Sequence, residues 1–165
     1  MARRKEESVM ASLAHSAFAA SILATILATA SAQAPKALQE AIRLHIAKQG
    51  PVSEQPKPTM ADLDGDKRDE AVVAYCIDEN LPGGANAGAS NRANVHCELA
   101  VFALRNGQWA LLGKAELGQG EVKEVNAGII HAESIKYAPK DPLCCPSLKR
   151  AVRFGLKAGK LVRVK

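Results

Sequence analysis

Aromatic residues are scarce in this chain. Its 165 residues include three Phe, two Tyr and one Trp, or 4% of the total, while 47% of the residues are hydrophobic. A core of this composition must rest on Val, Ile and Leu, and a small aliphatic core gains from covalent cross-links. The hydrophobic fraction is too high for long-range disorder, and the length favours one small globular domain over a two-domain enzyme.

Complete catalytic motifs are also absent from the sequence. No serine lies in a Gly-x-Ser-x-Gly elbow, and neither a phosphate-cradling glycine loop nor a dinucleotide-binding fingerprint is present. No repeat of 20–50 residues indicates a solenoid or a propeller. Beyond the N-terminal segment the histidines are limited to His45, His96 and His131. These absences favour a non-catalytic role.

The N-terminus has the pattern of an export signal. Three basic residues precede a charge-free apolar run at 17–30, and the small residues at 31–34 offer a cleavage point. The run is shorter than the ~20 residues that a membrane-spanning helix needs, and no cysteine directly follows it for lipid attachment. We therefore predict a signal peptide over 1–34 and a single exported domain over 35–165, periplasmic or secreted, with no stable membrane span after cleavage.

The remaining sequence predicts one helix followed by strands. Apolar residues recur at helical spacing between Pro35 and Gly50, a proline-rich linker follows at 51–58, and Asn106-Gly107 is the pair that a two-residue β-turn favours. Strands are expected at 71–77, 95–104, 109–117, 122–126, 129–137, 150–157 and 160–165. This order predicts an α+β fold in which one N-terminal amphipathic helix packs on an antiparallel sheet of about six strands.

Basic residues are dense in the two C-terminal strands. They are Arg150, Arg153, Lys157, Lys160, Arg163 and Lys165. Their alternation with apolar residues predicts a solvent-exposed face, with an anion-binding or membrane-surface patch as the alternative. The net charge of +5 is too small and too interspersed to indicate nucleic-acid binding.

An acidic segment precedes the first expected strand. Five carboxylates lie within nine residues, namely Asp62, Asp64, Asp66, Asp69 and Glu70. Such carboxylates repel one another unless a cation or solvent intervenes. Oxygen donors at positions 1, 3 and 5, with an acid at position 9, suit Ca²⁺, which takes six to eight hard oxygen ligands. An EF-hand is excluded, because a strand follows the segment and Lys67 takes the place of the EF-hand glycine.

The segment DLDGDKRDEAVVAY resembles the calcium loop of FG-GAP and related secreted repeats, in which an acidic loop of this spacing leads into a β-strand. The resemblance implies a Ca²⁺ site formed by the side chains of Asp62, Asp64, Asp66 and Glu70 and by the Arg68 carbonyl. Lys67 replaces the glycine usual after the third acid, and the chain carries one copy where propellers carry several, so the resemblance extends to the loop and not to the fold. The alternative is a solvated acidic turn that Lys67 and Arg68 neutralise without metal.

An even number of cysteines follows the export signal, which predicts disulfide bonds. They are Cys76, Cys97, Cys144 and Cys145. An antiparallel register that pairs Ala71 with Phe102 brings the first two within disulfide reach and leaves the adjacent pair to bond each other. The alternative joins each member of the adjacent pair to one of the first two, and the sequence does not select among the connectivities. A zinc site that includes His96 and a redox-active adjacent pair are further alternatives.

The C-terminal stretch that contains DPLCCPS resembles a group of exported bacterial proteins of uncharacterised function, including the LppP/LprE lipoprotein group. In these proteins a D-x-x-C-C/x-C-P-S segment precedes a closing hairpin. The resemblance implies a small exported domain and no particular activity. Because this chain lacks the acylated cysteine of the lipoproteins, it does not imply membrane tethering.

These patterns favour a non-catalytic exported interaction module. We expect a monomer that binds an envelope protein or polymer through its sheet or through the loop at 81–94, which is rich in small residues, with Ca²⁺ as an optional brace. The first alternative is a small envelope hydrolase in which His131 or His96 acts with a nearby carboxylate. The second is a secreted inhibitor of other enzymes.

Overall fold

The structure, a computed structural model, describes residues 34–90 and 92–165, and the predicted signal peptide lies outside the described residues except for Ala34. Its one α-helix, α1, spans Lys36–Ile46, and a 3₁₀ turn spans Arg92–Asn94. The strands are β1 (Thr59–Ala61), β2 (Glu70–Asp78), β3 (Val95–Arg105), β4 (Gln108–Gly118), β5 (Glu121–Asn126), β6 (Ile129–Lys136), β7 (Leu148–Lys157) and β8 (Lys160–Val164).

The strands form one mixed sheet, which overturns the predicted fold class. Their order is β1-β2-β3-β4-β6-β7-β8, and β5 pairs with β6 alone. Neighbours are antiparallel except β4 and β6, which run parallel and meet at Gly118 and Ile135. The predicted α+β fold, a helix on an antiparallel sheet of about six strands, is therefore wrong: the described chain is mostly β, with one short helix and an eight-stranded mixed sheet. The parallel pair arises because the chain reverses twice after β4: β5 runs back along the same edge of β6 that meets Gly118, and β6 then runs in the direction of β4.

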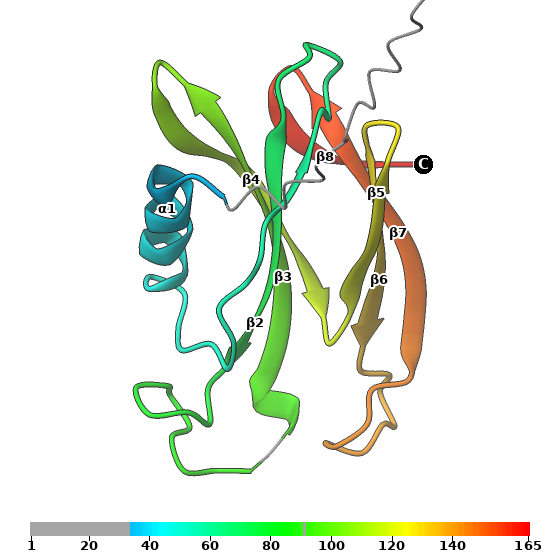
Figure 1. The fold of residues 1–165 in the computed structure, drawn as a ribbon. Coiled ribbons are helices and arrows are strands. Elements are labelled where there is room, and N and C mark those ends of the chain that lie inside the picture. Colours follow the sequence, from blue (N-terminus) through cyan, green and yellow to red (C-terminus); the bar gives the residue numbers. More distant parts are fainter. Residues whose placement is uncertain (1–33, 91) are drawn as a thin grey trace, which may run out of the picture. The chain divides into compact units, whose positions relative to one another are not determined.

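Strands β2 and β3 are buried on both faces. Figure 1 shows α1 on one side of β2–β4 and the strands β5–β7 on the other. On the helix side the core contains Leu38, Ile42 and Ile46 of α1, and on the opposite side it contains Ile130 of β6 and Phe154 of β7. Burial on both faces explains why 95–104 is a nearly continuous apolar run instead of a simple polar and apolar alternation.

Local sequence signals account for the elements that the sequence predicted correctly. The helix begins after Pro35, whose φ of −52° suits a helix start, and the backbone reaches a φ of 149° at Gly50 beyond its end. Asn106 and Gly107 adopt φ values of 51° and 78° in the turn between β3 and β4, as a two-residue hairpin requires. These signals are contained within a few residues and do not depend on distant parts of the chain.

Candidate functional site

The acidic loop connects β1 to β2 and gathers three of its carboxylates. One oxygen atom from each of Asp62, Asp64 and Glu70 lies within 4.8 Å of the others. Between the first two acids, Leu63 is buried in the core shared with β6 and β7. The loop is therefore anchored by an apolar side chain while the flanking carboxylates meet at its surface.

Backbone hydrogen bonds to Asp62 shape the acidic loop. Its Oδ1 accepts a hydrogen bond from the Gly65 amide at 2.7 Å, and its Oδ2 accepts one from the Lys67 amide at 2.9 Å. Gly65 has a φ of 82° and Lys67 a φ of 66°. The backbone at Lys67 thus has the left-handed conformation that a glycine would adopt without steric cost.

Glu70 lies at the base of the carboxylate group. Its side chain is 2% exposed, and its Oε2 accepts a hydrogen bond from the Leu63 amide at 2.9 Å. Burial raises the pKa of Glu70, and the charges on Asp64, Asp66 and Asp62 raise it further, against the effect of the Leu63 hydrogen bond. Glu70 therefore ionises less readily than a free glutamate side chain, and a cation bound nearby would favour its ionised form.

The structure brings together three of the five residues that the resemblance implied as ligands. Asp66 is outside the carboxylate group, because its side chain pairs with Arg68, whose Nη2 lies 2.6 Å from Oδ2. Hydrogen bonds from Arg68 lower the pKa of Asp66. Sequence reasoning did not find Arg105, whose Nη2 lies 3.8 Å from Oδ2 of Asp64 and which reaches the loop from the end of β3. The three gathered acids are suited to hold a metal ion, and their arrangement does not identify which metal.

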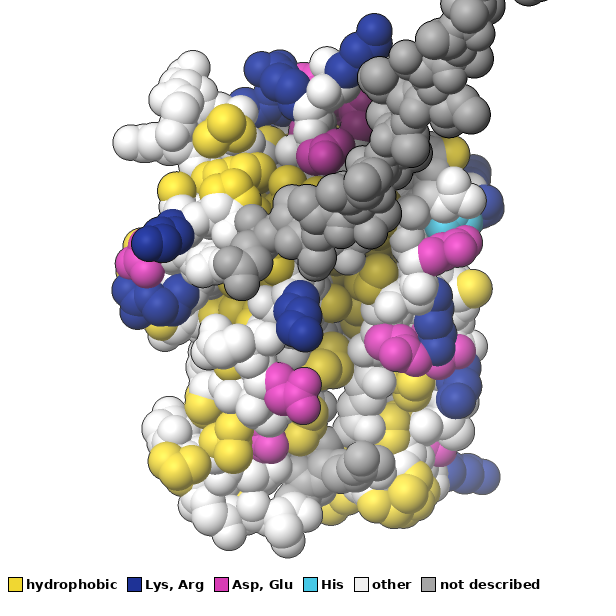
Figure 2. All heavy atoms as spheres, in the orientation of Figure 1, with side chains coloured by type: hydrophobic (Ala, Val, Ile, Leu, Met, Phe, Trp, Pro, Cys, Tyr) yellow, Lys and Arg dark blue, Asp and Glu magenta, His cyan; other side chains and the backbone are white. Residues whose placement is uncertain are grey.

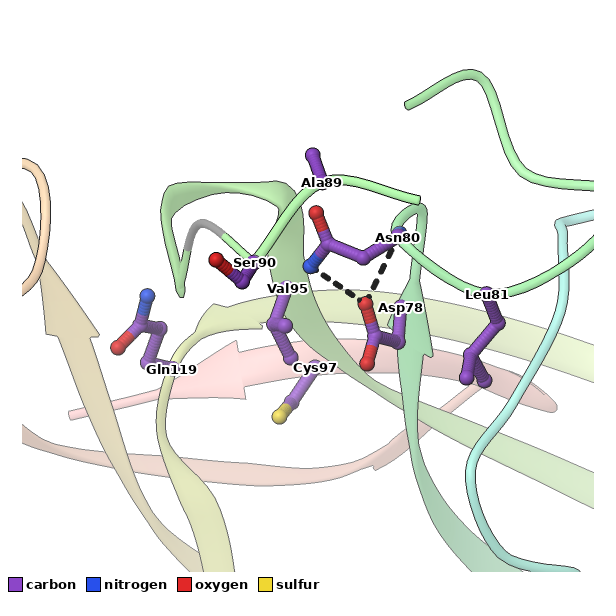
Figure 3. A pocket seen from close by; sticks show the side chains of 8 residues that line it. All are labelled: Asp78, Asn80, Leu81, Ala89, Ser90, Val95, Cys97 and Gln119. Carbon is purple, nitrogen blue, oxygen red and sulfur yellow. Dashed lines mark hydrogen bonds between the residues drawn. The ribbon is translucent and has the colours of Figure 1, made fainter. Parts of the chain in front are cut away.

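A second candidate site lies where the 79–94 loop joins β2 to β3. It is a cavity of about 610 Å³, which we call the loop cavity (Figure 3). Its lining residues are Asp78, Asn80, Leu81, Ala89, Ser90, Val95, Cys97 and Gln119. Carboxylate, amide and hydroxyl groups converge here beside a disulfide sulfur. Gln119, which follows β4, is a lining residue that the sequence did not predict.

Side-chain hydrogen bonds connect several of the described residues of the 79–94 loop. Asn80 donates from both its backbone and its side-chain nitrogen to Oδ1 of Asp78, as Figure 3 shows, and Asn94 donates to the side-chain oxygen of Asn80 at 2.9 Å. Farther along, the Asn86 side chain donates to a carboxylate oxygen of Glu79 at 2.6 Å. The abundance of Asn in this loop thus supplies side chains that replace strand hydrogen bonds.

Both disulfides link residues that the sequence had paired in one of its alternatives. Cys76 bonds Cys97 directly across β2 and β3, in the register that places Ala71 opposite Phe102. Cys144 bonds Cys145 in the loop between β6 and β7. Two disulfides are typical of proteins that fold in an oxidising environment outside the cytoplasm. The described part of the chain contains no helix that is long and apolar enough to cross a membrane.

A buried polar network connects α1 to the sheet. His45 Nε2 lies 2.8 Å from the Tyr75 hydroxyl, which donates to Glu98 at 2.6 Å, and Lys114 donates to the same carboxylate at 2.9 Å. The sequence did not predict the partners of His45. The feature of the sequence that could have indicated this network is Glu98, a charged residue within the otherwise apolar run at 95–104, on the side that faces the helix.

In the described part of the chain, His96 and His131 make no comparable contacts. His96 faces Ile77 across the β2–β3 ladder, and His131 faces Arg153 of β7. Among residues 34–90 and 92–165, no hydrogen bond joins either histidine to a carboxylate. The hydrolase alternative therefore gains no support from the arrangement of His96 or His131.

Comparisons with protein-family models, with curated proteins and with solved structures found no match to this chain. The resemblances to calcium loops and to exported lipoproteins stay predictions from the sequence. The geometry of the two candidate sites is accordingly the basis for any functional assignment.

The network predicts a pH dependence of stability. Burial lowers the pKa of His45, as does the charge on Lys114, whereas the imidazole of an unfolded chain titrates near ~6.5. As the pH falls below that value, the unfolded state takes up a proton that the folded state binds less well, so the free energy of unfolding decreases. Replacing His45 by Gln should flatten this decrease between about pH 7 and pH 5.5. Urea unfolding across that range measures it, and an unchanged slope in His45→Gln would contradict the assignment.

Proposed function

We propose that the protein is an exported interaction domain that binds an envelope protein or polymer at the loop cavity. The observation that carries this proposal is that two polar side chains of the lining, Asp78 and Asn80, are hydrogen-bonded to each other, and that Asn94 donates a further hydrogen bond to Asn80. Pre-arranged donors and acceptors lose little conformational entropy on binding, which favours recognition of a polar ligand. The proposal includes a periplasmic or extracellular location, which the two disulfides and the N-terminal sequence pattern support.

Catalysis has less support than binding at this position. Cleavage of a covalent bond needs a base, an orienting acid or a metal next to the reacting atoms. Asp78 is the one acid of the loop cavity lining, and its Oδ1 accepts hydrogen bonds from Asn80. Histidine is absent from that lining. Binding without reaction is therefore the function that these residues suit.

Blocking the loop cavity tests the binding function. Ser90 lines the cavity and is exposed, so Ser90→Tyr should fill the space without removing a hydrogen bond of the loop. Immobilised wild-type protein should retain a component of envelope extract that Ser90→Tyr does not retain. Gln108→Tyr, at the exposed β3–β4 turn, is the matched control and should behave as wild type. Equal retention by all three proteins would contradict binding at the loop cavity.

We further propose that Ca²⁺ is the ion held by the acidic loop. Its three gathered carboxylates are hard oxygen donors, and Ca²⁺ accepts carboxylate, carbonyl and water oxygens in a flexible shell. A bound dication would also offset the unfavourable ionisation of Glu70. The ion would brace the loop at the entrance to β2, far along the strand from the loop cavity.

Calorimetric titration tests the calcium proposal. Wild-type protein should give a saturable heat with Ca²⁺, and an ion at 100 times its Kd should raise the free energy of unfolding by about 2.7 kcal/mol. Asp64→Asn should remove both effects because it removes one of the three gathered carboxylates. Asp69→Asn deletes an equal charge outside the group and should retain them. The absence of heat at millimolar Ca²⁺ would contradict the proposal.

A further inference from the structure

The register of the last three strands turns two arginines toward the core side of the sheet. The pairs are Ser134 with Arg150, Ala132 with Val152, and Phe154 with Arg163. Directly paired residues share a face, and alternate residues of a strand share a face. Arg150 and Arg163 therefore lie on the same face as buried Val152 and Phe154, whereas Arg153 lies on the opposite face. All three arginines are solvent-exposed, as predicted, but Arg150 and Arg163 lie on the face of the sheet that carries the core.

This face carries a cationic hollow at the end of β6 and the start of β7. It has a volume of about 300 Å³, and we call it the β6–β8 cavity. Its polar lining consists of Lys136, Arg150, Arg163, Ser134 and Tyr137, and the buried side chain of Val152 is part of its apolar lining. Three cations and two hydroxyls thus converge on a small space, contributed by three strands and the residue that follows β6.

The charges in the β6–β8 cavity are poorly compensated by the protein. Within the described ranges, 34–90 and 92–165, neither Arg150 nor Arg163 has a carboxylate within ion-pair distance. Lys136 lies 3.6 Å from Glu116, in an exposed pair that contributes little. Like charges gathered without a counter-charge raise the free energy of the folded state, so an anion bound here would be stabilised by all three cations.

Ser134 provides an observation independent of the charges. It is 8% exposed and lines the cavity beside the three cations. A serine hydroxyl adds a hydrogen-bond donor without adding charge, which an oxyanion can use. Tyr137 is fixed at the rim, because its hydroxyl donates to the Leu143 carbonyl at 2.6 Å and accepts from Gln119 at 3.1 Å.

We propose that the β6–β8 cavity binds a phosphate group, either as inorganic phosphate or as a phosphomonoester. A guanidinium donates two parallel hydrogen bonds to an oxyanion, and two guanidiniums with an ammonium and a hydroxyl match the several oxygens and double charge of phosphate. A carboxylate, with one charge and two oxygens, would leave most of these donors unused. This site is separate from the loop cavity and from the acidic loop, and it stands whether or not the proposed binding function holds.

Titration of the exported domain with inorganic phosphate tests the proposal. Binding should saturate, and Arg150→Gln should weaken it by about tenfold or more, since charge-assisted hydrogen bonds are lost. The matched control is Arg153→Gln, which removes the same charge from the same strand on the opposite face and should leave the affinity within about twofold of wild type. Ser134→Ala should weaken binding without any change of charge. Arg163→Gln serves as the second charge variant if Arg150→Gln does not fold.

The outcomes distinguish a specific binding site from nonspecific attraction of anions by surface charge. Equal weakening by Arg150→Gln and Arg153→Gln would overturn the proposal, as would the absence of saturable binding at about 10 mM phosphate. Glycerol 3-phosphate in a parallel titration distinguishes the two sources of the group: binding of both compounds indicates a phosphomonoester site, and binding of inorganic phosphate alone indicates a site for the free ion. Sulfate is a doubly charged oxyanion that carries no proton at neutral pH. A parallel titration with sulfate therefore measures how much of the affinity comes from the charge of the anion alone.

Discussion

The antiparallel pairing of β2 with β3 is the interaction on which the other parts of the structure depend. These two strands are buried on both faces, by α1 on one side and by β6 and β7 on the other. A slip of one residue would exchange the faces of every side chain, and the Cys76–Cys97 bond across the pair holds the register. Both proposed sites of the binding domain lie at ends of this pair: the acidic loop enters β2 at Glu70, and the 79–94 loop connects β2 to β3.

The second half of the sheet is attached to this pair through a narrow junction. Strand β4 meets β6 at Gly118 alone, where a side chain would clash with the Ile135 carbonyl and where φ is 67°. In the space-filling view of Figure 2, basic and acidic side chains are interspersed on the visible face, as expected for a solvated surface. The face of β6–β8 that carries the core has a different charge distribution. There Arg150 and Arg163 lie next to the buried side chain of Val152, and both line the β6–β8 cavity.

The predictive value of the sequence differs between local and distant features. The helix, the Asn106-Gly107 turn and the acidic loop were recognisable because each depends on a few neighbouring residues. The strand order was not, since the pairing of both β4 and β5 with one edge of β6 is decided by packing between segments that no local signal connects. For the same reason, the face on which Arg150 lies and the Tyr75–Glu98 hydrogen bond could be placed only once the strand register was known. Asp66 was predicted as a metal ligand, and in the structure its side chain pairs with Arg68.

Hydrogen exchange of backbone amides tests most directly the claim that β2 and β3 organise the domain. Buried amides of Val73 and Val101, at the centre of the pair, should exchange only through global unfolding and should be the slowest in the chain. Amides of β7 and β8, at the other end of the sheet, should exchange faster through local opening. Slowest exchange in β7 and β8, with β2 and β3 opening at lower free energy, would contradict the account.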